Sequence, residues 1–483
     1  MEVDRLQVPT RRLPLRNETF VGSQGAYDVL IKYGVGEGMI MQGVGVDILK
    51  LSDGTRSIAE ITAELSDTYD VDSDTILNDA IAFLAHCRKE GIVRLDTQKT
   101  NRQVPTVIHD SGLSLVSARY RKPIPGSPLA VFWEITNTCN LKCIHCYKRA
   151  GKAEQNELST KECLQLVREM GKMHVMRVNF GGGEPLLRKD LLRIIRATKK
   201  AGMMTGLTTN GTLLTKEIAS QLAKLGVPVQ VSLDGARATT HERIRGKSGS
   251  YQQAIDAIHI LTGLGVDTRI GTVVMRPNLN EIPRMPQVIQ SLGVKIWNLM
   301  LLIPVGRATK SLMISPSQLK DLATELKAIR SQFPELIFPD ITGKFGLQRQ
   351  ENEGDRACLL DSNQGYSGCA AAHINLGISP QGYVRPCDFI PPSRANDNVR
   401  EKSLSEIWIN GHEFEAWRNI QIRGKCLSCP RFEKGCRAGC RAAAYGYWGD
   451  YGQSDPYCFI DVDNESGHPS EESSSQRVPI QGI

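Results

Sequence analysis

Residues 130–147 read "AVFWEITNTCNLKCIHCY", an apolar run of strand character that leads directly into three cysteines. Cys139, Cys143 and Cys146 have the spacing C-x3-C-x2-C. A structural zinc site and a complete cubane cluster each need four ligands. Three thiolates therefore leave one position for a ligand from outside the loop. His145 lies between two of the cysteines, and we expect its side chain to point away from them.

Strand-like and helix-like segments alternate from residue 130 to residue 306. The strand candidates are AVFWEIT, RVNFGG, MTGLTT, VPVQVSLD, TRIGTVVM and KIWNLMLLI. The helix candidates between them include TKECLQLVREMGKM, KDLLRIIRATKKAG, KEIASQLAKLG and YQQAIDAIHILTGLG. Ser159 and Glu162 form a capping-box signature at the start of the first of these helices. Six β-α units in succession predict an α/β fold with a parallel sheet, open or closed as a partial barrel.

Polar residues and glycines follow four of these strand candidates directly. They are Cys139, Gly182-Gly183-Glu184, Thr209-Asn210 and Ser232 with Asp234. Because ligands of parallel α/β folds bind at the carboxyl ends of the strands, we expect these residues to converge on one face. That face is the candidate site.

Length and composition limit the class of protein. A chain of 483 residues is long enough for several domains, and its net charge of +7 does not demand a nucleic-acid partner. The N-terminus has no apolar signal segment, and no run reaches the ~18 apolar residues of a membrane span. We therefore expect a cytoplasmic protein whose 13 cysteines serve metal or redox chemistry rather than disulfides.

The segment "NFGGGEPLL" follows the second strand candidate, and the aromatic Tyr147 follows the third cysteine. With the cysteine spacing, these features resemble the radical S-adenosylmethionine (SAM) superfamily. The resemblance implies a [4Fe-4S] cluster on Cys139, Cys143 and Cys146, with SAM on the open iron. Cleavage of SAM would give a 5′-deoxyadenosyl radical that abstracts a hydrogen atom. The alternative is a structural zinc knot.

The resemblance also assigns residues to SAM itself. Glu184 would bind the ammonium group, Arg245 the carboxylate, and Ser232 would contact SAM from the fourth strand. The full set of positions is Tyr147, Gly182, Gly183, Glu184, Thr209, Asn210, Ser232 and Arg245. Thr209 and Asn210 would line the ribose side. The alternative is that these residues only cap strand ends and form turns.

A second group of cysteines lies in the last third of the chain. Its members are Cys369, Cys387, Cys426, Cys429, Cys436, Cys440 and Cys458. Their order resembles the SPASM domain, which implies two auxiliary iron-sulfur clusters of the [4Fe-4S] type. The resemblance assigns the first cluster to Cys369, Cys387 and Cys440. It assigns the second to Cys426, Cys429, Cys436 and Cys458.

Three positions in this scheme have open alternatives. Cys358 is the candidate for the missing ligand of the first auxiliary cluster, or else an ordinary buried thiol. Asp388 follows Cys387, where sulfatase-maturing relatives have an acid thought to act as a base; otherwise it is a loop residue. Two zinc sites are the alternative to the clusters. Cys87 and Cys163 lie on apolar helix faces, and we expect them in the core.

The N-terminal segment contains "DILKLSDGTRSIAEITAELSDTYDVDSDTILNDAIAFLAHCRKEGIV". Ile58, Ile61 and Leu65 keep helical spacing, and a second helix and a closing strand follow. This winged-helix-like pattern resembles the PqqD peptide-recognition module, which adds the leader of a precursor peptide to an exposed sheet edge. The alternative is a DNA-binding winged helix. The helices are rich in Glu and Asp, which favours the peptide.

These resemblances predict five segments along the chain. They are a PqqD-like domain (16–98), a linker (99–127), a radical SAM core (128–335), a SPASM domain (336–462) and a disordered tail (463–483). We expect a peptide maturase that binds a precursor peptide through its leader and receives electrons from a flavodoxin or ferredoxin. We expect no nucleic-acid or membrane partner. The alternatives are tetrapyrrole (haem) biosynthesis, sulfatase maturation, or a zinc-bound DNA regulator.

Overall fold

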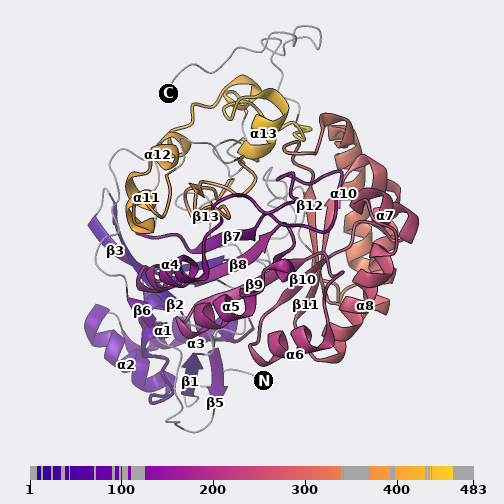
Figure 1. Cartoon of the computed structure of the whole chain (residues 1–483). Helices are drawn as coiled ribbons and strands as arrows, with labels where there is room; N and C mark the ends of the chain where they lie inside the picture. Colours follow the sequence, from indigo (N-terminus) through magenta and orange to yellow (C-terminus); the bar gives the residue numbers. More distant parts are fainter. Residues whose placement is uncertain are drawn as a thin grey trace.

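The computed structural model describes residues 44–69, 72–89, 93–96, 126–338, 369–391, 397–429 and 438–460, with positions 99, 341, 432 and 436. It also gives the backbone of residues 8–11, 15–22, 25–33, 38–42 and 107–109. Cys358 and the segment 463–483 lie outside the described residues. Figure 1 shows an N-terminal module in indigo, a large central region in magenta and pink, and a C-terminal region in orange and yellow.

The central region is built on a parallel sheet whose strands follow one another in chain order. The strands are β7 (Ala130–Thr136), β8 (Arg177–Gly182), β9 (Met204–Thr209), β10 (Val229–Ser232), β11 (Thr268–Val274) and β12 (Ile296–Leu301). The α-helices are α4 (Thr160–Lys172), α5 (Leu191–Lys200), α6 (Lys216–Lys224), α7 (Ala238–Arg245), α8 (Ser250–Gly263), α9 (Met285–Ser291) and α10 (Pro316–Gln332). Short 3₁₀ helices are η1 (Pro185–Leu187), η2 (Arg276–Arg284) and η3 (Lys310–Leu312). This arrangement confirms the predicted partial (β/α)6 barrel.

The burial of these strands explains why they could be predicted from the sequence. Trp133, Phe180 and Trp297, from three different strands, are at most 1% exposed and belong to one continuous core. A strand covered by helices on the outside and by side chains on the inside is apolar on both faces. At the start of α4, the side chain of Ser159 accepts a hydrogen bond from the Glu162 amide, and the Glu162 carboxylate accepts one from the Ser159 amide. The predicted capping box is therefore present.

The C-terminal region adds two strands to this sheet. β13 (Asn375–Ile378) pairs parallel to β7, and β14 (Val384–Arg385) pairs antiparallel to β13. The helices of this region are α11 (Leu404–Asn410), α12 (His412–Arg418), η6 (Gly424–Cys426) and α13 (Arg441–Trp448). The sequence analysis did not predict either strand. The pairing makes the cysteine-rich region continuous with the central sheet.

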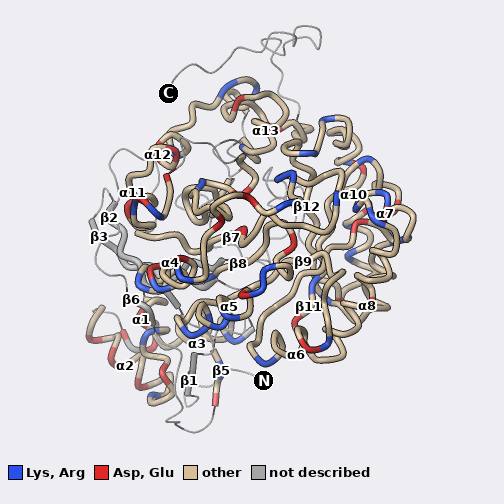
Figure 2. The backbone as a smooth tube through the Cα atoms, in the orientation of Figure 1, with Lys and Arg blue, Asp and Glu red and all other residues tan. Residues whose placement is uncertain are grey.

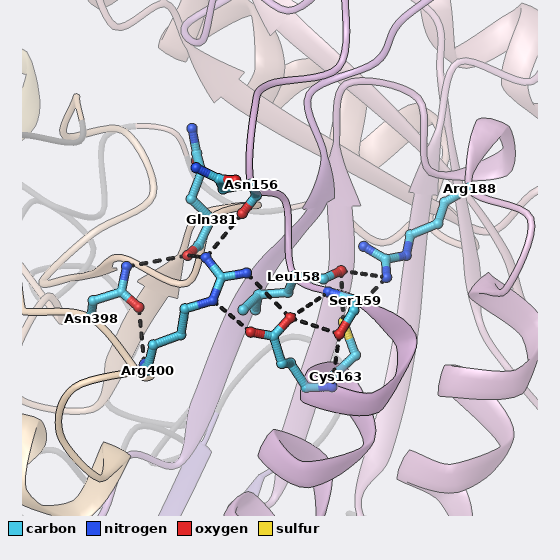
Figure 3. Close-up of polar contacts among 9 residues, drawn as sticks. Asn156, Leu158, Ser159, Cys163, Arg188, Gln381, Asn398 and Arg400 are labelled. Atoms are coloured by element: carbon cyan, nitrogen blue, oxygen red, sulfur yellow. Dashed lines mark hydrogen bonds and ion pairs between the residues drawn. The ribbon is translucent and has the colours of Figure 1, made fainter.

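Arg400 makes a second connection between these two regions (Figure 3). Its Nε lies 2.6 Å and its Nη2 3.2 Å from the two carboxylate oxygens of Glu162 in α4. Its Nη1 donates to the carbonyl oxygens of Asn156 and Gln381. The Leu158 amide donates to the carbonyl oxygen of Pro380 at 2.7 Å. The segment that leads into α4 is thus held directly by the C-terminal region.

The N-terminal module has its own small core. Its helices are α1 (Val44–Leu51), α2 (Ile58–Tyr69) and α3 (Ser73–Lys89). Its strands form a sheet in the order β4 (Gly38–Gln42), β3 (Gly25–Tyr33), β2 (Leu15–Gly22), β6 (Val107–His109), and a pair of β1 (Val8–Arg11) with β5 (Val93–Asp96). The residues predicted to face this core, Ile58, Ile61, Leu65, Ile76, Ala80, Leu84 and Cys87, are all at most 4% exposed. The helical pattern read from the sequence is confirmed.

Surface charge differs between the helices. Figure 2 shows acidic positions along α2, whereas α5 carries Lys and Arg. None of the helices in the described part of the chain combines the length and apolar character needed to cross a bilayer.

Candidate active site

The loops that follow β7 and β8 are in direct contact. The amide of Gly183 donates to the Thr136 carbonyl oxygen, and the amide of Glu184 donates to that of Thr138, both at 2.8 Å. A Cβ atom on Gly183 would lie 2.2 Å from the Thr138 carbonyl oxygen. Only glycine fits there, because the two backbones touch. Gly182, the last residue of β8, brings this loop to the start of the cysteine loop.

Glu184 joins the ends of β8 and β9. Its carboxylate is fully buried, and Oε1 accepts hydrogen bonds from the Thr209 hydroxyl (2.7 Å) and the Leu186 amide (3.1 Å). Oε2 accepts from the Asn210 amide at 2.8 Å. Burial raises the pKa of this carboxyl group, and the hydrogen bonds act in the opposite direction. Asn210 also donates to Asn140 of the cysteine loop at 2.9 Å, so these predicted residues form one bonded unit.

The three cysteines of this loop lie close to one another. Burial, followed by the neighbouring charges of Cys143, Glu184 and Cys146, raises the pKa of the Cys139 thiol to about 11. Without a metal such thiols stay protonated, and metal binding displaces the protons. Three thiols on one loop are a donor set whose chemistry fits an iron-sulfur cluster with one open iron.

Gly306 and Arg307, just after β12, hold the cysteine loop from the far side of the barrel. Arg307 donates from Nε to the Cys143 carbonyl oxygen and from Nη1 to that of Ala150, both at 2.9 Å. A Cβ atom on Gly306, where φ is +68°, would lie 2.1 Å from the Tyr147 carbonyl oxygen. The sequence analysis missed both residues. The signal was their position directly after the last strand candidate.

Arg245 lies beside Cys143 in a buried polar group. Its Nη2 is 2.7 Å from Oδ2 of Asp234, and its Nη1 is 3.9 Å from the Cys143 sulfur. Nε2 of His145 is 3.6 Å from the same Asp234 oxygen. Burial alone would raise the pKa of Asp234, but the charges of Arg245 and His145 outweigh it and lower that pKa. Burial lowers the pKa of His145 to about 4, so its ring is neutral near pH 7.

Ser232 is at the carboxyl end of β10, paired with Gly271 of β11. It shares the open end of the barrel with the loops described above, since β7 to β10 run parallel. Tyr147 directly follows Cys146, at the C-terminal end of the cysteine loop. Its ring centroid is 4.9 Å from that of Phe389 in the C-terminal region. The structure therefore brings the predicted residues to one end of the sheet, next to the C-terminal region.

The C-terminal cysteines form two groups. The pKa of the Cys387 thiol is raised by burial, and the charges of Asp388, Cys369 and Cys440 add to the shift. Burial and the charges of Cys458, Cys426 and Cys429 together raise the pKa of Cys436 to about 11. These neighbours are the same two sets that the resemblance assigned to the two auxiliary clusters. Among the described residues, no three His, Cys, Asp or Glu side chains form a site for a single metal ion.

Asp388 follows Cys387 and lies near Glu134 of β7. Burial and the nearby Glu134 charge raise its pKa to about 6. The Cys387 thiol points to its Oδ1 at 3.7 Å. Cys163, in contrast, is fully buried in the core, as expected.

Comparison with known proteins identifies the family. The radical SAM superfamily model matches residues 133–286, the coenzyme PQQ synthesis protein D model matches 29–93, and the iron-sulfur cluster-binding domain model matches 369–430. The AdoMet-dependent heme synthase of Methanosarcina barkeri is 33% identical over 69% of this chain and 96% of its own length. The chain belongs to the radical SAM superfamily. As a radical SAM enzyme with a SPASM domain, it uses SAM and iron-sulfur clusters.

Two further relatives show how much of the chain this superfamily covers. Mycofactocin maturase MftC of Mycolicibacterium smegmatis is 30% identical, over 66% of this chain and 79% of its own length. SuiB of Streptococcus suis bound to SAM has the same fold, with a TM-score of 0.65 at 18% identity over 93% of this chain and 100% of SuiB. SuiB bound to the precursor peptide SuiA gives 0.63 at 17%, over 94% and 100%. The family models confirm that the chain contains PqqD, radical SAM and SPASM domains.

Proposed function

We propose that this radical SAM enzyme modifies a ribosomally synthesised precursor peptide and forms a thioether or carbon-carbon crosslink. The observation that carries the proposal is the presence of a PqqD domain in the same chain as radical SAM and SPASM domains. A substrate with a leader needs a docking domain, whereas a small molecule does not. The SuiB fold supports the proposal, since its structure with the precursor peptide SuiA covers 94% of this chain.

We assign Cys139, Cys143 and Cys146 to a [4Fe-4S] cluster that has SAM on its open iron. When bound, the cluster and SAM would supply a 5′-deoxyadenosyl radical that takes a hydrogen atom from the substrate. Glu184 accepts three bonds from the protein, which leaves one acceptor position for the SAM ammonium group. Arg245 has an Nε without a hydrogen-bond partner among the described residues, which supports its assignment to the SAM carboxylate.

The other residues proposed to contact SAM are Tyr147, Gly182, Gly183, Thr209, Asn210 and Ser232. We assign two auxiliary [4Fe-4S] clusters to the C-terminal groups, the first to Cys369, Cys387 and Cys440 and the second to Cys426, Cys429, Cys436 and Cys458. Cys358 is the proposed fourth ligand of the first cluster. Asp388, whose raised pKa of about 6 suits a group that exchanges protons near neutrality, is the proposed base.

We propose that the leader adds to the edge strand β4. β4 is at the end of the four-stranded sheet and within the residues that match PqqD. An added strand gains affinity from backbone hydrogen bonds, and alternate side chains give selectivity. A flavodoxin or ferredoxin would supply electrons to the clusters, and we expect the compartment to be the cytoplasm.

A tetrapyrrole substrate is the second candidate, because the haem synthase of Methanosarcina barkeri is 33% identical. That match covers 69% of this chain. The span from the PqqD match to the end of the SPASM match, residues 29–430, is longer than this. The similarity to the haem synthase therefore does not include the whole of the PqqD and SPASM regions together. The peptide remains the better-supported substrate.

The experiment uses the full chain, reconstituted with iron and sulfide without oxygen. The protein is incubated with SAM, dithionite and each short peptide encoded beside its gene, and the products are analysed by mass spectrometry. A peptide lighter by two hydrogen atoms, absent with Cys146→Ala, supports the proposal. Conversion of a tetrapyrrole with no change in any peptide would favour the second candidate. Iron by metal analysis and absorption near ~400 nm would exclude the zinc alternatives.

A further inference from the structure

Glu134 of β7 is a buried carboxylate that contacts both cysteine regions. Its side chain is 3% exposed, and Oε2 lies 2.9 Å from Nζ of Lys148 and 2.5 Å from Nη2 of Arg385. Lys148 comes two residues after Cys146, and Arg385 comes two residues before Cys387. One carboxylate oxygen therefore joins the cysteine loop of the core to the Cys387 loop of the SPASM domain.

Burial makes these contacts costly to break. The side chains of Lys148 and Arg385 are 7% and 1% exposed, so water cannot solvate their charges. Removing one member of a buried ionic group leaves an uncompensated charge and is strongly destabilising. Oε1 of Glu134 and Nε of Arg385 have no hydrogen-bond partner among the described residues. The group is thus held by charge attraction rather than by a complete hydrogen-bond network.

Arg385 passes this constraint to the rest of its own loop. Its Nη1 donates to the Ile390 carbonyl oxygen at 2.6 Å. The turn that carries Cys387 and Asp388 is therefore closed by the same guanidinium that contacts Glu134. The Tyr147 and Phe389 rings make a second contact between the two loops, with centroids 4.9 Å apart.

We infer that Glu134 is a positioning residue for the reaction. Through Lys148 and Arg385 it fixes the separation between the radical SAM cysteine loop and the Cys387 loop. A reaction that uses both loops in one turnover depends on that separation, whether the substrate is a peptide or a tetrapyrrole. The inference does not rest on the substrate proposed above.

The first test is hydrogen-deuterium exchange of the full chain before iron is loaded. Glu134→Gln keeps the shape of the side chain but removes its charge. We expect about tenfold faster amide exchange or more in residues 139–151 and in residues 384–391 together. The matched control is Glu281→Gln, because Glu281 is also buried but binds Arg237 and Thr240. The control should leave the amide exchange of both cysteine loops unchanged.

A second variant keeps the test decisive if Glu134→Gln fails to fold. Lys148→Met leaves the Glu134–Arg385 pair in place, so exchange should rise in residues 139–151 and not in residues 384–391. In the iron-loaded chain, a redox titration followed by electron paramagnetic resonance gives an independent measure. Glu134→Gln should raise the reduction potentials of more than one cluster, because a nearby negative charge disfavours the reduced state.

Three results would overturn the inference. The first is faster exchange in only one of the two loops with Glu134→Gln. The second is an equal effect of Glu281→Gln on both loops. The third is a folded Glu134→Gln protein in which neither the exchange nor the potentials change. The exchange measurement needs no substrate. The inference can therefore fail while the proposed peptide function stands, and the peptide function can fail while the inference stands.

Discussion

Replacing Arg400 with methionine is expected to loosen the SPASM domain from the core without disturbing either interior. Arg400 contacts α4 through both carboxylate oxygens of Glu162, and it contacts the segment before α4 through the Asn156 carbonyl oxygen (Figure 3). Methionine keeps most of the aliphatic length but removes every one of these donors. The Ser159–Glu162 capping box shares the Glu162 oxygen Oε2 with Arg400, but its own hydrogen bonds need no atom of Arg400, so the start of the helix should remain intact.

The size of the effect follows from the exposure of the pair. The Arg400 and Glu162 side chains are 34% and 35% exposed. Ion pairs at exposed sites typically contribute about 0–1 kcal/mol to stability. The bidentate geometry of the Arg400–Glu162 pair favours the upper end of that range. The hydrogen bonds from Nη1 to two carbonyl oxygens add about 0.5–1.5 kcal/mol each at most, and solvent can replace part of that. We therefore expect Arg400→Met to cost about 1–2 kcal/mol.

The assay is chemical unfolding of the full chain, with hydrogen-deuterium exchange of residues 154–163 measured in parallel. Lys402→Met is the matched control, because it removes the same charge from the same segment. Lys402 pairs with Asp397 at 2.7 Å, within the C-terminal region itself. We expect the control to leave both the stability of the chain and the exchange in residues 154–163 nearly unchanged, because Lys402 is a surface residue. Equal losses from the two substitutions would show that Arg400 does not connect the domains.

Three further predictions concern the core. Gly306→Ala should abolish iron binding at the Cys139–Cys146 loop, because the added Cβ would lie 2.1 Å from the Tyr147 carbonyl oxygen. Gly293→Ala is the control for backbone strain, because Gly293 has nearly the same φ (+69°, against +68° at Gly306) but open space around it. The measurement is the iron content of each variant. Hydrogen bonds from Arg400 and Ser159 lower the pKa of Glu162 from its ordinary 4.5 to about 2. The contribution of this pair is therefore present above about pH 4.5 and lost as the pH falls toward 2, so the stability gap between parent and Arg400→Met should narrow over that range. Glu184→Gln should cost about 1–3 kcal/mol, since its amide group would face backbone and hydroxyl donors, and SAM should no longer raise the melting temperature.

The central strands could be predicted nearly to the residue. Ala130–Thr136, Arg177–Gly182 and Met204–Thr209 coincide with the apolar runs read from the sequence. β7 is buried along almost its whole length, β8 and β9 have buried residues interrupted by less buried ones, and polar residues or glycine mark the strand ends. β13 (Asn375–Ile378) could not be found in this way. Four residues show no period, and this strand exists because it pairs with β7, more than 200 residues earlier.

The residues of the candidate site, too, could be predicted from the sequence only where they belong to a local motif. The cysteine loops and the glycine-rich loop carry motifs whose spacing is local, so the sequence was enough to propose them. Arg307 and Glu134 carry no motif. Each is a polar residue on a strand or just beyond its end, and its partners come from distant parts of the chain. Only the folded arrangement shows that they hold the cysteine loops.

Strand β7 connects these observations. It leads into the core cysteine loop, it pairs with β13 of the SPASM domain, and it carries Glu134, which binds Arg385. A displacement of the SPASM domain would therefore act directly on the strand that positions Cys139. The Arg400–Glu162 contact acts at the outer edge of the same junction, through α4. If both act on one junction, Glu134→Gln and Arg400→Met should not be additive in stability, because the two sites are coupled through β7 and α4. Strict additivity would mean that the two contacts stabilise the junction independently.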